Sequence, residues 1–306
     1  MTADAALVPG ATGTIDYVVN CFLPNRQEVW DGAIASSGIA VKVRRDPTDA
    51  FCDADEMVAR MDELGVATLC LSTCDIADHG TLSRYDFEHV ATRWEEMEKL
   101  VGRFPGRFVA LMAPNPGKGM AAVFDARARL AEPWVAGFYL HTHSWDRPFD
   151  HPDFYPYYAL CSEFDVPFTM QAGTSGGLMP SACGQPVGID RPALFFPQTN
   201  FMLSHLGWPW VDEAIAMALK FPNVYLGTGA YPPRHYSDAV RSFIRGPGKR
   251  KTIFGTNFPT VGHRHALAQI DELELRDDVR YNLLEGNARS IFHRLPGAAA
   301  SGGAHR

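Results

Sequence analysis

Ile15-Asp16-Tyr17-Val18-Val19-Asn20 lies in the first of eight short apolar segments that alternate with segments of helical periodicity. The candidate strands are 14–21, 66–73, 107–113, 135–142, 166–171, 200–205, 223–228 and 251–256. Helical stretches follow most of them, at about 55–64, 88–101, 119–132, 153–164, 211–221, 236–244 and 264–273. Strands that alternate with helices pair in parallel, and eight such units close most economically as a barrel. The sequence therefore predicts a distorted α/β fold, a (β/α)8 TIM barrel with an extra C-terminal helix at about 276–293.

The chain shows one composition regime and no internal repeat, which indicates one domain over residues 14–293. Residues 1–13 and 294–306 are rich in small residues, and we expect flexible termini there. Two connections are long, 22–53 after the first strand and 173–197 after the fifth. Loops of this length are usually functional, and both would lie at the C-terminal mouth of the barrel, where barrel enzymes place their sites.

Composition excludes several classes of protein. Of 306 residues, 46% are hydrophobic and 21% are charged, and the net charge of −7 argues against nucleic acid as a partner. We expect no membrane partner, because no apolar run approaches the length of a membrane span. The six cysteines contain no CxxC pair, and the N-terminus does not resemble a signal peptide. Reduced thiols and a cytoplasmic location are therefore expected, and a homo-oligomer is compatible with the sequence.

Several motifs follow one another in a fixed order. They are the first strand, His-Leu-Gly-Trp-Pro-Trp at 205–210, Pro-Asn-Val-Tyr at 222–225, Phe-Gly-Thr-Asn-Phe-Pro at 254–259 and Asn-Ala-Arg at 287–289. Together this set resembles the ACMSD-like branch of the amidohydrolase superfamily, the amidohydrolase-related (amidohydrolase-2) family. The resemblance covers about residues 14–293. It implies a barrel enzyme, a hydrolase or a non-oxidative carboxy-lyase (decarboxylase), that acts on small carboxylated compounds. Some relatives hydrolyse lactones without a metal.

The residues that usually bind the metal in this family differ here. The resemblance places ligand histidines at Val18 and Asn20 on the first strand, a third at Gln171, and a ligand aspartate at Asn257. Valine cannot bind a metal, and neutral amides are poor ligands that do not offset its charge. We therefore expect a metal-independent site with no cofactor. One alternative stays open, a displaced metal site formed by His141, His143 and His205.

Strand alternation suggests which side chains face the lumen. On the first strand we expect Asp16, Val18 and Asn20 to point inward and Ile15, Tyr17 and Val19 to pack against helices. On the fourth strand the same argument turns Tyr139, His141 and His143 inward. On the fifth strand Thr169 and Gln171 share a face.

The expected catalytic residues are His205, His143 and Asp16. Imidazole titrates near neutrality, so His205 is the best candidate for the general acid or base. Asp16 could orient a neighbouring histidine or be a buried structural acid. The expected substrate-binding residues are Asn20, His141, Gln171, Asn257 and Arg234, since amides stabilise oxyanions and arginine can clamp an anion. Cys70 and Cys74 lack an obvious paired base and are expected to be inert.

Two functional hypotheses follow. The first is a metal-independent hydrolase or carbon–carbon lyase, with a small, anionic, carbonyl-containing substrate that is carboxylated or a lactone. The second is a non-catalytic homologue that binds a metabolite or a partner protein, which the replaced ligands would also explain. The several histidines expected in the lumen favour the first, because titratable groups cluster at functional sites.

Overall fold

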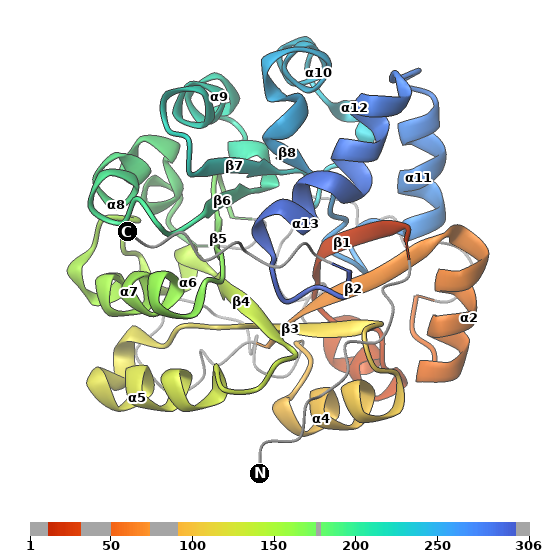
Figure 1. The fold of residues 1–306 in the computed structure, drawn as a ribbon, viewed down its shortest axis with the longest axis horizontal. Coiled ribbons are helices and arrows are strands. Elements are labelled where there is room, and N and C mark those ends of the chain that lie inside the picture. Colours follow the sequence, from red (N-terminus) through yellow and green to blue (C-terminus); the bar gives the residue numbers. More distant parts are fainter. Residues whose placement is uncertain (1–11, 32–49, 74–90, 176–178, 298–306) are drawn as a thin grey trace.

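The computed structural model describes residues 12–31, 50–73, 91–175 and 179–297, and its centre is a parallel sheet in the order β1 to β8 (Figure 1). The strands are β1 Thr14–Val19, β2 Val66–Thr73, β3 Phe108–Met112, β4 Val135–Leu140, β5 Phe168–Gln171, β6 Phe201–Ser204, β7 Val224–Gly227 and β8 Thr252–Ile253. Helices that follow the strands form the outer ring: α2 Ala54–Leu64, α4 Trp94–Arg103, α5 Met120–Arg129, α7 Tyr155–Phe164, α8 Asp190–Phe195, α9 Val211–Lys220, α10 Asp238–Arg245 and α11 His263–Asp271. The predicted (β/α)8 barrel is confirmed.

The barrel closes between β1 and the segment that follows β8. Val19 forms an isolated parallel bridge with Phe258. The backbone N–H of Tyr17 donates to the carbonyl of Phe254 at 3.3 Å, and that of Asn257 donates to the carbonyl of Val18 at 2.9 Å. These bonds satisfy the edge of β1 and bring residues 254–258 beside the first strand.

A register shift in β1 changes which side chains face the lumen. Asp16 pairs with Leu69 and Val19 pairs with Leu71, so β1 has one more residue than β2 over this step. Such a bulge disrupts simple alternation. Ile15, Tyr17 and Val18 accordingly belong to one apolar cluster with inward residues of the other strands, whereas Val19 packs with the outer helices. The prediction that Ile15 and Tyr17 face the helices is wrong.

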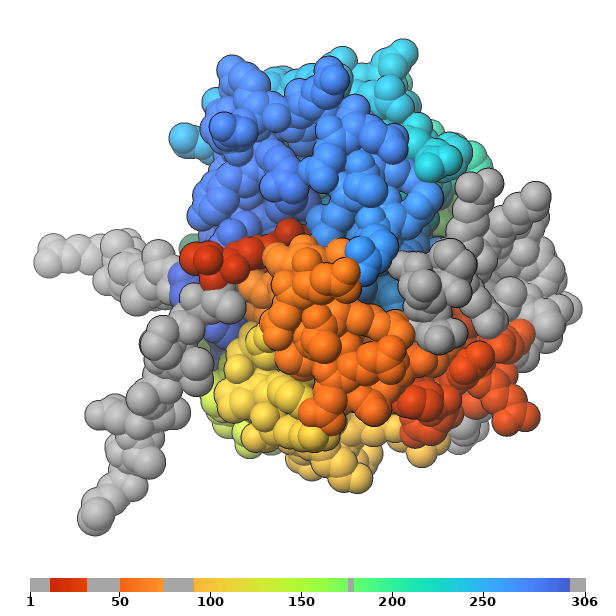
Figure 2. All heavy atoms as spheres, turned by 90° about the vertical axis from the view of Figure 1, so that its right-hand side faces the viewer, coloured from red at the N-terminus to blue at the C-terminus, as the bar shows by residue number. Residues whose placement is uncertain are grey.

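Helix α2 shows how local sequence places the outer ring. Its N-cap is Asp53, whose carboxylate accepts a hydrogen bond from the N–H of Glu56 at 2.9 Å, and it ends at Gly65 in the left-handed region. Met57 and Met61 are one turn apart and both are buried. Figure 2 shows α2, in orange, on the outer surface beside the blue C-terminal helices.

The C-terminal segment adds α12 (Asp277–Tyr281), one π-helical turn (Asn282–Gly286) and α13 (Asn287–Ile291). The extra C-terminal helix is therefore present, as three short pieces. Ala288, Ile291 and Phe292 join the same cluster as Ile15 and Tyr17. The side chains of α13 thus cover the lumen-facing apolar residues.

Some predictions fall wholly or partly outside the described residues. These are the flexible termini at residues 1–11 and 298–306, most of the loop 22–53, and the first part of the helix predicted at 88–101. In the loop 173–197, the described part contains two 3-10 turns and α8. Among the described residues, no helix has the length and apolar character needed to cross a membrane.

Candidate active site

Three predicted histidines meet where β4, β5 and β6 end. His141 directly follows β4 and His205 directly follows β6, while His143 lies on the short helix α6 (Thr142–Trp145). The ring centroids of His141 and His143 are 6.2 Å apart, and His143 lies near enough to His141 and His205 to contribute to the lowered pKa of each. The structure thus brings the three together. It also corrects one detail, because β4 ends at Leu140 and His143 is therefore not on a strand.

Burial keeps these imidazoles neutral at physiological pH. Burial, with a smaller contribution from the nearby His143, lowers the pKa of His205 to about 3. Burial lowers the pKa of His141 to about 3 as well, with smaller contributions from His143 and His205. The site therefore offers neutral rings, each with one N–H donor and one lone pair.

The protein fixes His143 through one nitrogen. Its Nε2 lies 2.9 Å from the carbonyl oxygen of Gly173, which only accepts, so Nε2 carries the hydrogen. Its Nδ1 is enclosed without a hydrogen bond, beside the side chain of Gln171, whose Oε1 is also enclosed and unpaired. Burial lowers the pKa of His143, while the contacts with Gly173 and Gln171 act in the opposite direction.

A chain of hydroxyl groups connects His205 with the first strand. The Nδ1 of His205 lies 2.7 Å from the hydroxyl of Ser204, which lies 2.6 Å from the phenol oxygen of Tyr17. The backbone N–H of Gly229 donates to that phenol at 3.0 Å. Tyr17 thus crosses the lumen from β1 to β6 and the loop after β7.

Neither Tyr17 nor Ser204 was predicted as a site residue. The signal that could have found Tyr17 is the run of glycines opposite it. A Cβ added to Gly227 or Gly255 would come within 2.4 Å of the Tyr17 ring, and one on Gly229 within 2.8 Å of its hydroxyl. Glycine inside a strand often marks the close approach of another group, and here that group is an aromatic ring.

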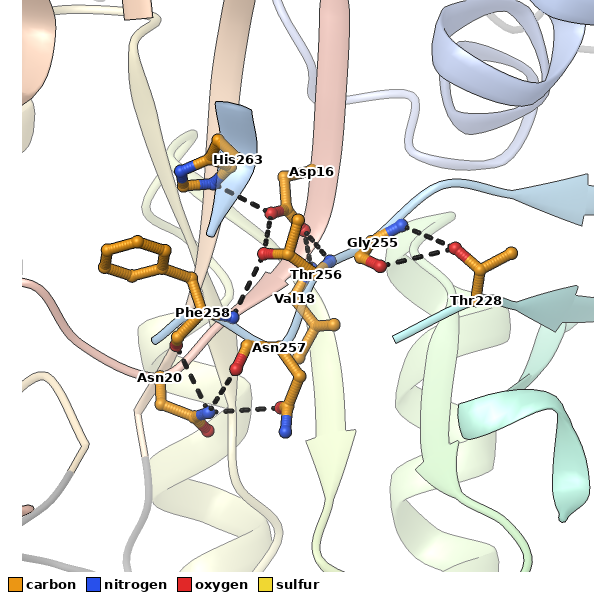
Figure 3. A network of polar contacts seen from close by, with 9 residues as sticks. All are labelled: Asp16, Val18, Asn20, Thr228, Gly255, Thr256, Asn257, Phe258 and His263. Carbon is orange, nitrogen blue, oxygen red and sulfur yellow. Dashed lines mark hydrogen bonds and ion pairs between the residues drawn. The ribbon is translucent and has the colours of Figure 1, made fainter. Parts of the chain in front are cut away.

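Asn20 and Asn257 contact each other at the junction of β1 and the segment after β8 (Figure 3). The Nδ2 of Asn20 donates to the Oδ1 of Asn257 at 3.1 Å and to the carbonyls of Asn257 and Phe258 at 3.3 Å. Two of these acceptors are backbone carbonyls, so the orientation of the Asn20 amide is fixed. Its amide hydrogens are used within the protein, so its side-chain oxygen is the atom left to accept a hydrogen bond from a ligand.

The family's metal does not fit this set of donors. Val18 has no donor atom, the Oδ1 of Asn257 already accepts from Asn20, and Gln171 is a neutral amide on another strand. Within the described ranges, no group of three or more His, Cys, Asp or Glu side chains is placed to hold a metal ion.

Asp16 lies away from the three histidines, so the prediction that it faces the lumen is wrong. Its Oδ1 accepts from the backbone N–H of Thr256 at 3.0 Å and from that of Val18 at 3.1 Å. Its Oδ2 accepts from the Thr256 hydroxyl and lies 3.0 Å from Nε2 of His263 on α11 (Figure 3). The physical reason is the bulge in β1, which turns Asp16 toward the outer helices.

His263 is buried and its ring stacks on Phe258, with centroids 4.7 Å apart. It lines a small pocket of about 40 Å³ between α2 and α11 together with Met57, Arg60 and Phe258. The Asp16–His263 pair therefore belongs to the outer wall of the barrel.

Arg234, which was predicted to bind the substrate, does not join the histidines, and Cys70 was expected to be inert. Arg234 is exposed, and its backbone bonds to Gln269 of α11 and Arg241 of α10. Cys70 is fully buried, and burial raises the pKa of its thiol well above the usual value. Cys74 lies outside the described residues.

The contact between Gly184 and His143 gives a testable stability effect. A Cβ on Gly184 would come within 2.2 Å of the Gly173 carbonyl and 2.7 Å of Nε2 of His143. We expect Gly184→Ala to lower the free energy of unfolding by about 1–3 kcal/mol, as overpacking does. Urea denaturation measures it.

Gly102→Ala on α4 is the matched control, because a Cβ there meets nothing within 4 Å. Alanine in a helix should stabilise by about 0.5–1 kcal/mol relative to glycine. Equal effects of the two substitutions would contradict the described packing around His143.

The barrel and the order of its site segments match a known family. Residues 74–294 match the family model Amidohydro_2, described as amidohydrolase. The chain belongs to this amidohydrolase family. Its relatives place it among the hydrolases and lyases of the amidohydrolase superfamily.

Three similar proteins illustrate the range of relatives. A 2-keto-4-carboxy-3-hexenedioate hydratase from Sphingobium sp. (strain NBRC 103272 / SYK-6) is 23% identical over 255 residues, 68% of this chain and 74% of the hydratase. The crystal structure of an uncharacterized TIM-barrel protein from Bordetella bronchiseptica has a TM-score of 0.74 and 19% identity, over 92% of this chain and 99% of that one. A dihydroxybenzoic acid decarboxylase from Polaromonas sp. JS666, with bound manganese and 2-nitroresorcinol, has a TM-score of 0.63 and 18% identity, over 92% and 97%. These structural likenesses support the fold.

Proposed function

We propose that this protein is a lyase or hydrolase for a small, carboxylated, carbonyl-containing substrate, with His205 as the group that handles the proton. The observation that carries the proposal is the position of His205 where β6 ends, beside two other neutral imidazoles. Its Nε2 has no hydrogen bond within the described part of the chain and is not among the enclosed unpaired atoms, so it is open to a ligand. The hydratase relative acts on a keto acid, and the decarboxylase relative on a dihydroxybenzoic acid.

We further propose that the reaction proceeds without the family's usual metal. The support is chemical: an aliphatic side chain and three neutral amides stand at the four positions of the family's ligands, and two of the amides bond to each other. In this arrangement His205 and its neighbours polarise the substrate by hydrogen bonding. Asn20 presents an oxygen, which suits a hydroxyl group or a water molecule.

Metal analysis tests this second proposal directly. We expect the purified protein to contain metal well below one equivalent, and treatment with EDTA followed by dialysis to leave turnover unchanged. Elemental analysis by mass spectrometry and assays before and after chelation measure both. A stoichiometric manganese or zinc whose removal abolishes turnover and whose return restores it would overturn the proposal.

The reaction class is tested by a substrate panel. Hydroxybenzoic acids report decarboxylation, unsaturated keto acids report hydration, and carboxylated lactones report hydrolysis. We expect turnover in at least one class, and the His205→Asn variant to lack it. If every compound only binds, with no product in any class, the non-catalytic alternative gains and the proposed function fails.

A further inference from the structure

The hydrogen-bonded series of hydroxyl groups that ends at His205 determines which nitrogen of its ring carries the hydrogen. The chain runs from Nδ1 of His205 to the Ser204 hydroxyl and from there to the Tyr17 phenol. Tyr17 and Ser204 are both completely buried, so bulk solvent does not reach their hydroxyl groups. Each hydroxyl has one hydrogen to donate, and the chain can therefore be resolved by counting donors.

The count begins at the phenol oxygen of Tyr17. It accepts from the backbone N–H of Gly229 at 3.0 Å. The backbone of His205 also contacts it, and these contacts partly offset the rise that burial causes in the pKa of Tyr17. Among the described partners of the phenol, the Ser204 hydroxyl is the acceptor available to its own hydrogen, so Tyr17 donates to Ser204. Ser204 then accepts from Tyr17 and donates its hydrogen to Nδ1 of His205.

The opposite direction is less favourable. If Nδ1 of His205 donated to Ser204, Ser204 would donate to Tyr17 and the phenol hydrogen would have no acceptor among its described partners. A buried donor left without a partner costs about 1–3 kcal/mol. That difference is large enough to select one tautomer.

We propose that Tyr17 and Ser204 are positioning residues that hold neutral His205 in the Nε2–H tautomer, so that it presents an N–H donor to the carbonyl oxygen of the substrate. This inference rests on the proposed function and narrows the role of His205 from handling a proton to donating a hydrogen bond. In this tautomer Nε2 has no lone pair with which to accept a proton. His205 is therefore the donor that stabilises negative charge on an oxygen, and the favoured substrates are those that develop an enolate or oxyanion.

The state of the ring is measured without any substrate. The full-length protein, labelled with ¹⁵N-histidine, is studied by NMR at pH 7, and the His205 signals are assigned by their loss in His205→Asn. We expect the Nε2 of wild-type His205 to carry the hydrogen and its Nδ1 to be bare. A hydrogen on Nδ1 in the wild type would overturn the inference even if the enzyme is active.

Two variants test the hydrogen-bonded series formed by Tyr17, Ser204 and His205. Ser204→Ala and Tyr17→Phe should each bring the two ¹⁵N shifts of His205 closer together, as the tautomers mix. Turnover should fall about 2- to 10-fold, in step with the lost donor form, with a smaller change in KM. Ser162→Ala is the control, because that hydroxyl bonds to Thr199 elsewhere in the barrel.

The outcomes separate the two proposals. An unchanged tautomer in both variants contradicts the role of the hydroxyl chain, whatever the activity. The expected tautomer in a protein that turns over no substrate in the panel contradicts the proposed function instead. If Ser204→Ala does not fold, Tyr17→Phe, which keeps the ring that fills the lumen, still gives the result.

Discussion

Substitution of His205 should lower turnover by about 10²- to 10⁴-fold, the usual effect of losing a general acid or base or a donor to a developing oxyanion. His205 adopts a left-handed backbone conformation with φ of 64°. Asparagine tolerates that region better than most residues, so His205→Asn removes the imidazole with little backbone cost. Steady-state kinetics with the substrate found in the panel measures the loss, and circular dichroism checks the fold.

The matched control is His235→Ala, which removes an exposed histidine from the loop after β7. It should leave turnover unchanged. If His205→Asn retains wild-type turnover, His205 has no part in the chemistry and the proposed role is lost.

The pH dependence provides a second measurement on the same residue. An unfolded histidine has a pKa near 6.5, whereas burial lowers that of His205 to about 3. The unfolded chain therefore binds more protons between these values, so this contribution to stability is complete above pH 6.5 and is lost as pH falls toward 3. His205→Asn should show a weaker loss of stability between pH 7 and pH 5 than the wild type.

Removal of the Asp16 carboxylate should have the largest effect on stability. Asp16→Ala leaves His263, the Thr256 hydroxyl and two backbone N–H groups without their buried acceptor. Loss of one partner of a buried pair typically costs about 3–5 kcal/mol. We expect a fall of this size in the free energy of unfolding, measured by urea denaturation at pH 7.

The control for Asp16 is Asp190→Ala, which breaks a surface pair with Lys220 at 2.7 Å. Exposed pairs of this kind contribute about 0–1 kcal/mol, so the change should be small. An Asp16→Ala variant as stable as this control would mean that the buried network does not hold the barrel closed at β1 and β8.

The sequence was sufficient for the fold because the eight strands and their helices each carry their own local pattern. Helix α2, for example, is specified by the Asp53 cap, the buried Met57 and Met61, and Gly65. These signals are short-range and need no knowledge of the rest of the chain. The three histidines were also predictable, since each follows directly on the end of a strand or one turn later.

Local sequence patterns did not predict which side chains of β1 point into the lumen. Alternation assigns Asp16 to the lumen, but the bulge before Val19 depends on pairing with β2, whose partner residues lie more than 50 positions further along the chain. For the same reason the sequence did not indicate the buried positions of Tyr17 and His263. Their contacts come from β6, β7 and the segment after β8, which are distant in the sequence. The roles of the site residues stay predictions that the variants above test.

The Tyr17 ring limits which amino-acid substitutions this barrel can accept during evolution. Its space exists because residues 227, 229 and 255 carry no side chain, and even a methyl group at any of them would overlap it. A larger residue at one of these three positions would be accepted only after residue 17 had become smaller. These four positions lie on β1, on β7 and in the segments that follow β7 and β8. They should therefore vary together or stay fixed together among related sequences.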